Sequence, residues 1–275
     1  MGTQLVKTLS EDHEVVTWDR EDLDVLDFPL LAEKVGALRP EVIINAVAYN
    51  AVDKCESAAD YPLALKLNGE LVGRLADLAR EQKALFIHYS SDYVFNGTEE
   101  KWSFLESDTP NPVNKYGESK FQGERELEKR AGGGLDYYLI RTSKLFGPLG
   151  ASELAKPSFF DIMLDLAQNK KELTVVKEEL SCFTYTPDLA AATKRLLESD
   201  FQSGVYHLIN EGPVTWYEAA QTLLKLKKIS LPIRAVRSEN LLRPARRPKF
   251  SVLLNTKTKR LRNWQEALKE YLSEK

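Results

Sequence analysis

Tyr116 and Lys120 are the side chains of this sequence whose types and spacing best suit proton transfer. They lie four residues apart in a segment, 114–131, that we expect to be helical, so both side chains share one helix face. A nearby ammonium favours a phenolate and lowers the pKa of a tyrosine from its usual value of about 10. Such a tyrosine can exchange a proton with a substrate oxygen while hydride arrives at the carbon. On its own, the same spacing is equally typical of a pair on a helix surface.

Small polar side chains follow two apolar segments elsewhere in the chain. The run 84–88 leads into Ser90 and Ser91, and the run 42–44 leads into Asn45 and a series of small residues. If both runs are parallel strands, their carboxyl ends lie at the edge of the sheet where ligands bind. A serine there can stabilise negative charge that develops on a carbonyl oxygen. The alternative is a Ser-Ser turn that caps the strand, with the small residues serving helix–sheet packing.

The elements that must position these residues alternate along the chain. Short apolar strands that alternate with helical patterns predict βαβ units, a parallel sheet and right-handed crossovers. We therefore expect an α/β fold, a Rossmann-like doubly wound parallel sheet. The expected helices cover residues 2–10, 29–37, 61–82 and 114–131, and the expected strands cover 14–18, 42–44, 84–88 and 137–140.

Composition and charge exclude several classes of protein. The chain has 275 residues, 43% of them hydrophobic, which suits one large domain with or without a small lobe. Its net charge of −3 provides no general attraction to nucleic acid or to an anionic membrane, and we expect neither partner. We find no signal peptide and no apolar run that could span a bilayer. Two distant cysteines and three scattered histidines predict free thiols, a cytoplasmic location and no metal site.

Beyond these patterns, the sequence resembles the dTDP-4-dehydrorhamnose reductase family of extended short-chain dehydrogenases. The resemblance covers nearly the whole chain, in order. Its motifs are Asn45–Tyr49 with Ala51–Lys54, Ser91–Phe95, Tyr116-Gly-x-x-Lys120, Ile140–Ser143, Thr184–Ala190, Thr215–Glu218, Arg247-Pro248 with Ser251, and Trp264-x-Glu-Ala-Leu268.

The resemblance implies reduction of dTDP-4-dehydro-L-rhamnose to dTDP-L-rhamnose with NADPH or NADH, for nucleotide-sugar and cell-surface polysaccharide biosynthesis. By position, Tyr116 would give a proton to the C4 oxygen, Lys120 would orient the cofactor, and Ser91 would polarise the carbonyl. The residues expected to contact the cofactor are Gly2, Asp24, Val25, Asn45, Ala48, Tyr49, Asn50, Tyr116 and Lys120. Those expected to contact the nucleotide-sugar substrate are Ser91, Asp92, Lys144 and Arg247.

Three features depart from the family pattern. The family's opening strand and most of its Gly-x-x-Gly-x-x-Gly loop are lacking, and Gly2 corresponds to the last glycine of that loop. We therefore expect an NAD(P)-binding domain over 1–147 without its first strand, and a mostly substrate-binding lobe over 148–275 with some segments returning to the main sheet. Lys144 replaces the family's tryptophan, and 178–183 replaces its Asp-Gln-x-Gly-x-Pro loop. The added charge at Lys144 suits a diphosphate or an acidic sugar.

Several alternatives stay open at this stage. Asp19 would bond the adenosine ribose and favour NADH, whereas the adjacent Arg20 would tolerate the phosphate of NADPH. Arg247, in a basic loop, either contacts a diphosphate or belongs to a solvated surface. The competing functions are a non-catalytic regulatory subunit of the same fold and a reductase or epimerase for another nucleotide sugar. A homodimer is also possible.

Other conspicuous residues favour structural roles. His88 lies within an apolar strand, which predicts a buried side chain with its hydrogen bonds satisfied. Trp216 and Trp264 fit helix packing better than ligand stacking. The glycines at 132–134 follow a helix and precede a strand, which is typical of a flexible turn.

Overall fold

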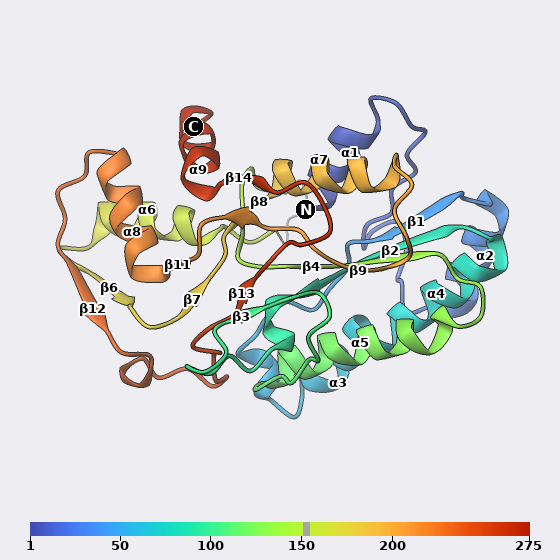
Figure 1. Ribbon diagram of the computed structural model, residues 1–275, viewed down its shortest axis with the longest axis horizontal. Helices are drawn as coiled ribbons and strands as arrows, with labels where there is room; N and C mark the ends of the chain where they lie inside the picture. Colours follow the sequence, from blue (N-terminus) through green and yellow to red (C-terminus); the bar gives the residue numbers. More distant parts are fainter. Residues whose placement is uncertain (151–154) are drawn as a thin grey trace.

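A parallel sheet of four strands runs through the centre of the protein, as seen in a computed structural model that describes residues 1–150 and 155–275 (Figure 1). Every neighbouring pair in this sheet is parallel, which confirms the predicted α/β fold. In spatial order the strands are β1 (Val42–Asn45), β2 (Leu85–Ser91), β4 (Tyr137–Thr142) and β9 (Gly204–His207).

Helices cover both faces of this sheet, so its central strands are buried on both sides. Successive side chains of β2 face opposite ways: Phe86 packs into a core with α2 and α4, while Ile87 packs into a core with α1 and α7. Figure 1 shows α1 and α7 above the sheet and α4 and α5 below it. The bounds of these helices are α1 (Gly2–Leu9), α2 (Phe28–Leu38), α4 (Leu71–Gln82), α5 (Lys115–Ala131) and α7 (Thr186–Leu197).

The predicted strand at 14–18 is wrong. Those residues form no strand, although Val15 and Trp18 still pack against the two cores that flank the sheet. A strand needs a hydrogen-bonded neighbour, and within the described residues β1 pairs with β2 alone. An apolar, β-branched composition is therefore insufficient here without a partner strand.

The predicted helix over 61–82 is continuous but not uniform. It consists of α3 (Tyr61–Leu65), a π-helical turn η2 (Lys66–Glu70) and α4. Such π turns occur mostly as single turns within α-helices and often at functional sites. The glycines at 132–134 form the predicted turn after α5, with Gly134 in the left-handed region at φ 81°.

A second group of elements surrounds a separate, strongly aromatic core that includes Phe160, Phe183 and Trp264. Most of the rings in this core lie in the second half of the chain, while β9 from the same half joins the main sheet. The boundary at residue 147 stays a prediction. The elements around this core are α6 (Phe159–Asn169), β6 (Leu173–Val176), α8 (Trp216–Leu226), β12 (Ile233–Val236) and α9 (Trp264–Ser273).

Short elements complete the described chain. Four pairs of them form small two-stranded ladders: β3 with β13, β5 with β8, β7 with β11, and β10 with β14. The bounds are η1 (Lys54–Glu56), η3 (Asp92–Val94), β3 (Ser103–Phe104), β5 (Leu145–Phe146), β7 (Leu180–Ser181), β8 (Thr184–Tyr185), β10 (Asn210–Glu211), β11 (Val214–Thr215), η4 (Ser238–Asn240), β13 (Val252–Leu253) and β14 (Leu261–Asn263).

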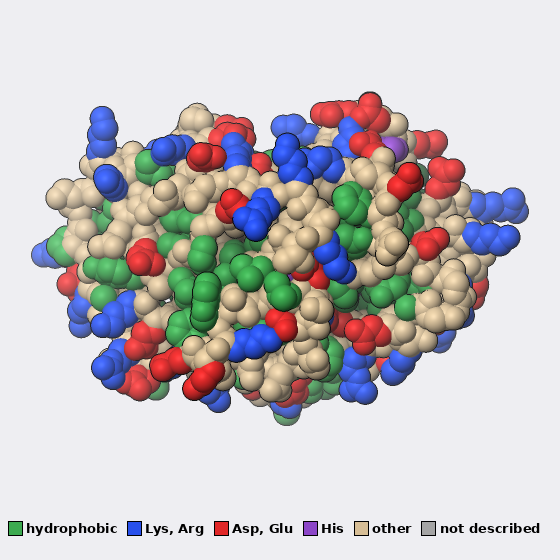
Figure 2. Space-filling view, viewed as in Figure 1, with side chains coloured by type: hydrophobic (Ala, Val, Ile, Leu, Met, Phe, Trp, Pro, Cys, Tyr) green, Lys and Arg blue, Asp and Glu red, His purple; other side chains and the backbone are tan. Residues whose placement is uncertain are grey.

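The surface shows how the charged side chains are distributed, and the helices can be compared with the length that a membrane span needs. On the face seen in Figure 2, basic and acidic side chains are interspersed rather than gathered by sign. Among the described residues, none of the helices combines the length and the apolar character needed to cross a membrane.

Candidate active site

The carboxyl end of β2 carries Ser91, the residue predicted to polarise a carbonyl. Its hydroxyl accepts a hydrogen bond from the backbone N–H of Tyr93 at 3.2 Å and donates to Asp92 at 3.2 Å. The first of these bonds caps the turn η3, so Ser91 has a structural role at the end of the strand, and its role toward a carbonyl stays a prediction. Capping the turn fixes the serine at the edge of the sheet, in contact with the helix α5.

A close approach between α5 and η3 brings Tyr116 next to Ser91. Asn114 begins the helix, because its side chain accepts a hydrogen bond from the N–H of Gly117 at 2.8 Å. A Cβ atom on Gly117 would lie 2.2 Å from the carbonyl oxygen of Tyr93, so only glycine allows this approach. The ring of Tyr116 then packs edge-on against that of Tyr93, with centroids 5.8 Å apart.

The environment of Tyr116 raises its pKa to about 12. Burial is the main cause; a hydrogen bond with Ser91 opposes it, and the negative charge of Asp92 adds to it. The predicted lowering by a neighbouring ammonium is therefore wrong. The Nζ of Lys120 is directed elsewhere, since it donates to the carbonyl oxygen of Tyr89 at 2.6 Å.

Lys120 is buried beneath the helix, and burial lowers its pKa to about 8 despite the opposing charge of Glu124. Glu124 lies one turn further along α5 and forms a buried, bidentate ion pair with Arg141 of β4, at 3.0 and 2.7 Å. Ser90 also donates to Glu124, at 2.5 Å. These contacts attach the helix to two central strands, so the Tyr116–Lys120 face has a fixed position over the sheet.

Asp92 lies in a cage of hydroxyl groups rather than on an open surface. It is 2% exposed and accepts hydrogen bonds from Ser143 at 2.8 Å and Ser251 at 2.6 Å, as well as from Ser91. Burial raises its pKa, and the three hydroxyls and the charge of Lys144 act against that rise. Its predicted contact with substrate stays a prediction.

Lys144 carries a buried ammonium with an aromatic partner. Its Nζ lies 3.7 Å from the ring centroid of Trp216 and 5.2 Å from that of Phe183, which are cation–π distances. Among the described residues this nitrogen has no hydrogen-bond partner. Burial lowers its pKa to about 8, against the attraction of Asp92 and Glu179. Trp216 therefore covers a charged group in addition to the helix packing that was predicted for it.

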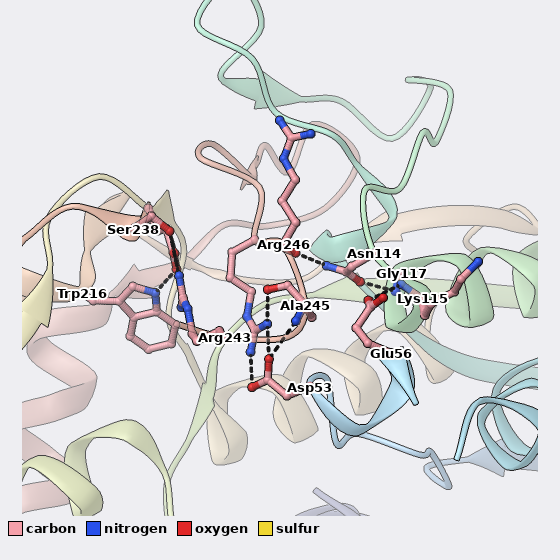
Figure 3. A network of polar contacts seen from close by, with 12 residues as sticks. Asp53, Glu56, Asn114, Lys115, Gly117, Trp216, Ser238, Arg243, Ala245 and Arg246 are labelled. Atoms are coloured by element: carbon pink, nitrogen blue, oxygen red, sulfur yellow. Dashed lines mark hydrogen bonds and ion pairs between the residues drawn. The ribbon is translucent and has the colours of Figure 1, made fainter. Parts of the chain in front are cut away.

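A loop over residues 237–250 crosses between the two groups of elements, and we call it the strap. Arg247 of the strap forms a bidentate ion pair with Asp53, at 2.8 Å for both bonds. The strap also contacts the start of α5, because Asn114 donates to the carbonyl of Arg246 at 2.7 Å. Figure 3 shows the contact between Asn114 and Arg246, with the side chain of Arg246 extending away from Asp53. The Arg247 side chain is thus only 10% exposed, although neighbouring residues of the strap such as Leu242 and Arg246 are exposed.

The other end of the strap contacts the second group of elements through Glu179. This carboxylate accepts hydrogen bonds from Arg243, from Ser238 at 2.6 Å and from Trp216 at 2.9 Å. Although burial raises its pKa, these donors outweigh burial and lower it overall. Since Trp216 also covers Lys144, the strap and the Lys144 ammonium belong to one connected network.

The loop after β1 is open at the positions predicted to meet a cofactor. Ala48 and Asn50 are exposed, while Tyr49 is half-buried and donates its hydroxyl to Asp60 at 2.7 Å. Asn45 is different: it is buried and its amide pairs with His88 at 3.1 Å. His88 is buried as predicted, but its Nε2 has no partner among the described residues, so its hydrogen bonds are only half satisfied.

Three further residues that were predicted to contact the cofactor lie outside the loop after β1: Gly2, Asp24 and Val25. Gly2 starts α1 with open space where a Cβ would be, Asp24 is exposed and accepts a hydrogen bond from the N–H of Leu26 at 3.0 Å, and Val25 packs against a core. In the described part of the chain, none of them hydrogen-bonds to Ser91, Tyr116 or Lys120. Their cofactor contacts stay predictions.

Four functional candidates escaped the sequence reasoning. Asn114 has a recognisable signal, an asparagine directly before a predicted helix. Asp53 and Glu179 lie in segments that the family resemblance singled out, 51–54 and 178–183, but no role was assigned to either. Asn68 has no signal, since its partners lie far away in the sequence.

The residues at the ends of β1 and β2 fit a nicotinamide dinucleotide. The exposed residues 46–48 are small or apolar, which permits close approach of a ligand. Lys120 uses one of its three ammonium hydrogens in the described residues, so two donors are free for ribose hydroxyls. Across the described ranges, no three His, Cys, Asp or Glu side chains are grouped so as to hold a metal ion. Cys55 and Cys182 are free and buried, and burial raises the pKa of both thiols.

Comparisons with known proteins agree on one family. The family model described as "RmlD substrate binding domain" matches residues 1–275. A spore coat polysaccharide biosynthesis protein of Bacillus subtilis is 32% identical over 100% of this chain and 94% of its own length. A dTDP-4-dehydrorhamnose reductase of Burkholderia thailandensis is 33% identical over 98% of this chain and 89% of its own. A crystal structure of the Bacillus anthracis dTDP-4-dehydrorhamnose reductase in complex with NADP superposes with a TM-score of 0.88, at 27% identity, over 99% of this chain and 96% of that one.

Proposed function

This chain belongs to the dTDP-4-dehydrorhamnose reductase family, and we propose that it reduces dTDP-4-dehydro-L-rhamnose to dTDP-L-rhamnose with NADPH or NADH. The observation that carries the proposal is the convergence of Ser91, Tyr116 and Lys120 at the carboxyl end of β2. A regulatory subunit without activity has no need of this set. The product serves nucleotide-sugar and polysaccharide biosynthesis.

Tyr116 suits the role of proton donor to the C4 oxygen. Because burial raises its pKa to about 12, it holds its proton near neutral pH. Ser91 lies against the same phenol. Its single hydroxyl hydrogen, which here bonds to Asp92, can turn to the carbonyl oxygen and disperse the negative charge that develops there. A bound nicotinamide supplies the hydride. Lys120 contributes two N–H donors that are unused among the described residues and can hold the ribose hydroxyls, and its buried position keeps them rigid.

The remaining cofactor contacts are proposed along the loops that precede this centre. Ala48, Tyr49 and Asn50 line the exposed edge after β1, and Asn45 supports that loop from beneath by accepting a hydrogen bond from the N–H of Val47 at 3.0 Å. Gly2, Asp24 and Val25 are assigned to the pyrophosphate and adenosine half by the family resemblance alone.

We propose that the nucleotide sugar binds between Ser91, Asp92, Lys144 and Arg247. Two observations support this placement. In the part of the chain that the structure describes, the Lys144 ammonium lacks a hydrogen-bond acceptor, which an oxygen of the substrate can supply. The planar guanidinium of Arg247 binds both carboxylate oxygens of Asp53 in this structure. The same two-point geometry suits two oxygens of a diphosphate. The free, buried cysteines also support a cytoplasmic location.

The test is reduction of dTDP-4-dehydro-L-rhamnose by the purified chain, followed through the loss of NADPH or NADH absorbance. Product analysis should identify dTDP-L-rhamnose. As a comparison, the same assay with a UDP-linked 4-keto sugar should give a lower kcat/KM. Cofactor binding without oxidation of either cofactor, at any substrate, would contradict the proposal and favour the regulatory alternative.

A further inference from the structure

Two departures from the family pattern, Lys144 and the segment 178–183, are distant in the sequence but meet in the structure. The N–H of Thr184, directly after the segment, donates to the carbonyl of Lys144 at 3.2 Å. The Lys144 ammonium lies 5.2 Å from the ring centroid of Phe183, and the charge of Glu179 attracts it. Together the two departures form one wall of the candidate site, which we call the Lys144 wall.

Ser181 of the Lys144 wall carries a deeply buried hydroxyl group. It is 1% exposed, and its oxygen makes no hydrogen bond with the residues that the structure describes. Leu180 and Cys182 pack into one core, whereas Phe183 packs into the aromatic core. Because side chains alternate along an extended segment, Ser181 faces the side of Phe183, where the Lys144 ammonium also lies.

The Lys144 ammonium and the Ser181 hydroxyl are both hydrogen-bond donors. Within residues 1–150 and 155–275 neither group has a hydrogen-bond partner, and such burial costs free energy that a bound acceptor recovers. The ammonium has three N–H donors and the hydroxyl has one O–H donor. A carboxylate has two oxygens that can accept from both groups, and its charge is opposite to that of the ammonium.

The carboxylates of the protein near this wall have other partners. Asp92 accepts hydrogen bonds from three serine hydroxyls, and Glu179 forms an ion pair with Arg243. Both carboxylates attract the Lys144 ammonium through space, without a hydrogen bond to it in the described part of the chain. The ammonium therefore stays available to a carboxylate that a ligand brings.

The Lys144 wall lies at the end of the site where the sugar would react. Asp92 attracts the Lys144 ammonium and accepts a hydrogen bond from Ser91 at 3.2 Å. If Ser91 holds the C4 oxygen, as proposed above, the substituents on the ring carbons next to C4 are the ones nearest to Lys144.

We propose that Lys144 and Ser181 form a subsite for a carboxylate, so that this chain also reduces nucleotide-linked 4-keto sugars that carry a carboxylate on the ring carbon next to the keto carbon. This inference rests on the proposed reductase function. The bond changes are the same: C4 takes up the hydride, and its oxygen takes the Tyr116 proton. The carboxylate keeps all its bonds and serves only to bind.

The Trp216 ring covers this subsite, 3.7 Å from the Lys144 nitrogen. Because that nitrogen is inaccessible to solvent, a carboxylate reaches it only when the ring moves aside. Binding of a carboxylated ligand should therefore change the fluorescence of the protein, and Trp216→Phe should lack this change.

The experiment compares the binding of dTDP-glucuronate and dTDP-glucose by calorimetry. These ligands differ only in a carboxylate for a hydroxymethyl group, and neither has a keto group to be reduced. The wild type should bind dTDP-glucuronate more tightly. Lys144→Met should weaken the binding of dTDP-glucuronate about 10- to 100-fold, the range for a lost bond to a charged group, and that of dTDP-glucose by less.

Ser181→Ala covers the case in which Lys144→Met does not fold. It should weaken the binding of dTDP-glucuronate about 2- to 10-fold, as expected for a neutral hydrogen bond, and leave that of dTDP-glucose unchanged. Thr184→Val is the matched control, because Thr184 has a 0% exposed hydroxyl group, also without a partner in the described ranges, on the opposite face of the segment. This control should keep the wild-type ratio of the two affinities.

Three results would overturn the inference. The first is an equal loss of affinity for both ligands in Lys144→Met, and the second is a Ser181→Ala variant whose affinity ratio equals that of Thr184→Val. The third is a loss of affinity for dTDP alone as large as that for dTDP-glucuronate, which would place Lys144 at the diphosphate.

An assay of turnover separates the subsite from the function itself. With NADPH, the wild type should reduce the 4-keto derivative of dTDP-glucuronate, and reduction of dTDP-4-dehydro-L-rhamnose alone would overturn the inference. If the wild type prefers dTDP-glucuronate in binding but reduces neither keto sugar, the proposed function fails, while the affinities of the Lys144 and Ser181 variants still decide the subsite.

Discussion

The two sides of the candidate site differ in how completely their charges are paired. On the Tyr116 side, Lys120 bonds to the Tyr89 carbonyl and Asp92 accepts from three serines, so both buried charges have partners. On the opposite side, the Lys144 ammonium has aromatic rings but no hydrogen-bond acceptor within residues 1–150 and 155–275. An unpaired buried polar group costs free energy that a ligand can recover. The difference agrees with our proposal that the fold completes the Tyr116 side, whereas the substrate would complete the Lys144 side.

The largest effect that we expect is a fall in kcat when Tyr116, on the first of these two sides, is replaced. Tyr116→Phe keeps the ring that packs against Tyr93 and removes only the proton donor, so kcat should fall about 10²- to 10⁴-fold. Steady-state kinetics measure the fall, and thermal unfolding should show a stability close to that of the wild type. Undiminished turnover in this variant would remove Tyr116 from the mechanism.

A smaller effect is expected from Arg247 in the strap. Arg247→Ala should raise the KM for the nucleotide sugar about 10- to 100-fold, the range for a lost bond to a charged group. Arg246→Ala is the matched control, because the Arg246 side chain is exposed and points away from Asp53 (Figure 3). Asp53→Asn provides a second control: it weakens the ion pair but keeps the guanidinium, so the KM should not rise. Equal increases in all three variants would assign Arg247 to loop structure alone.

The smallest and most diagnostic effect is a pH-dependent change in thermal stability when Lys144 is replaced. Burial lowers its pKa to about 8 from 10.5, so the folded state holds this proton less tightly than the unfolded state. The cost of the buried ammonium is fully present below pH about 8 and declines as the pH rises from there toward the unfolded value. Lys144→Met should therefore unfold at a higher temperature than the wild type near neutral pH, with the difference narrowing above pH about 8.

The same variant should bind substrate more weakly. In the wild type, the KM for the nucleotide sugar should rise as the pH passes through about 8 and the ammonium is lost, and Lys144→Met should lack this rise. Melting curves and KM values over a common pH series measure both effects. A variant that is less stable than the wild type at neutral pH would show that Lys144 is already paired in solution, and the contrast between the two sides would disappear.

Local features of the site could be predicted because they depend on short spacings. Tyr116 and Lys120 are one helical turn apart, so their common face follows from the helix itself, and β2 and β4 were evident as apolar runs between helices. The prediction of a strand at 14–18 was wrong because a strand depends on a distant partner. Its composition suits a strand, but a strand exists only with a partner, which composition does not reveal.

The sequence by itself determined the alternating α/β order, the Tyr116–Lys120 face and the serine at the end of β2. Only the tertiary structure decided the pKa of Tyr116, the serine cage around Asp92 and the aromatic cover of Lys144. Asp92 meets Ser143 and Ser251 across 51 and 159 residues of sequence, and Asn68 meets Ser119 across 51. Burial and hydrogen bonding at such separations depend on how the elements pack against one another, and helical or strand periodicity carries no information about that.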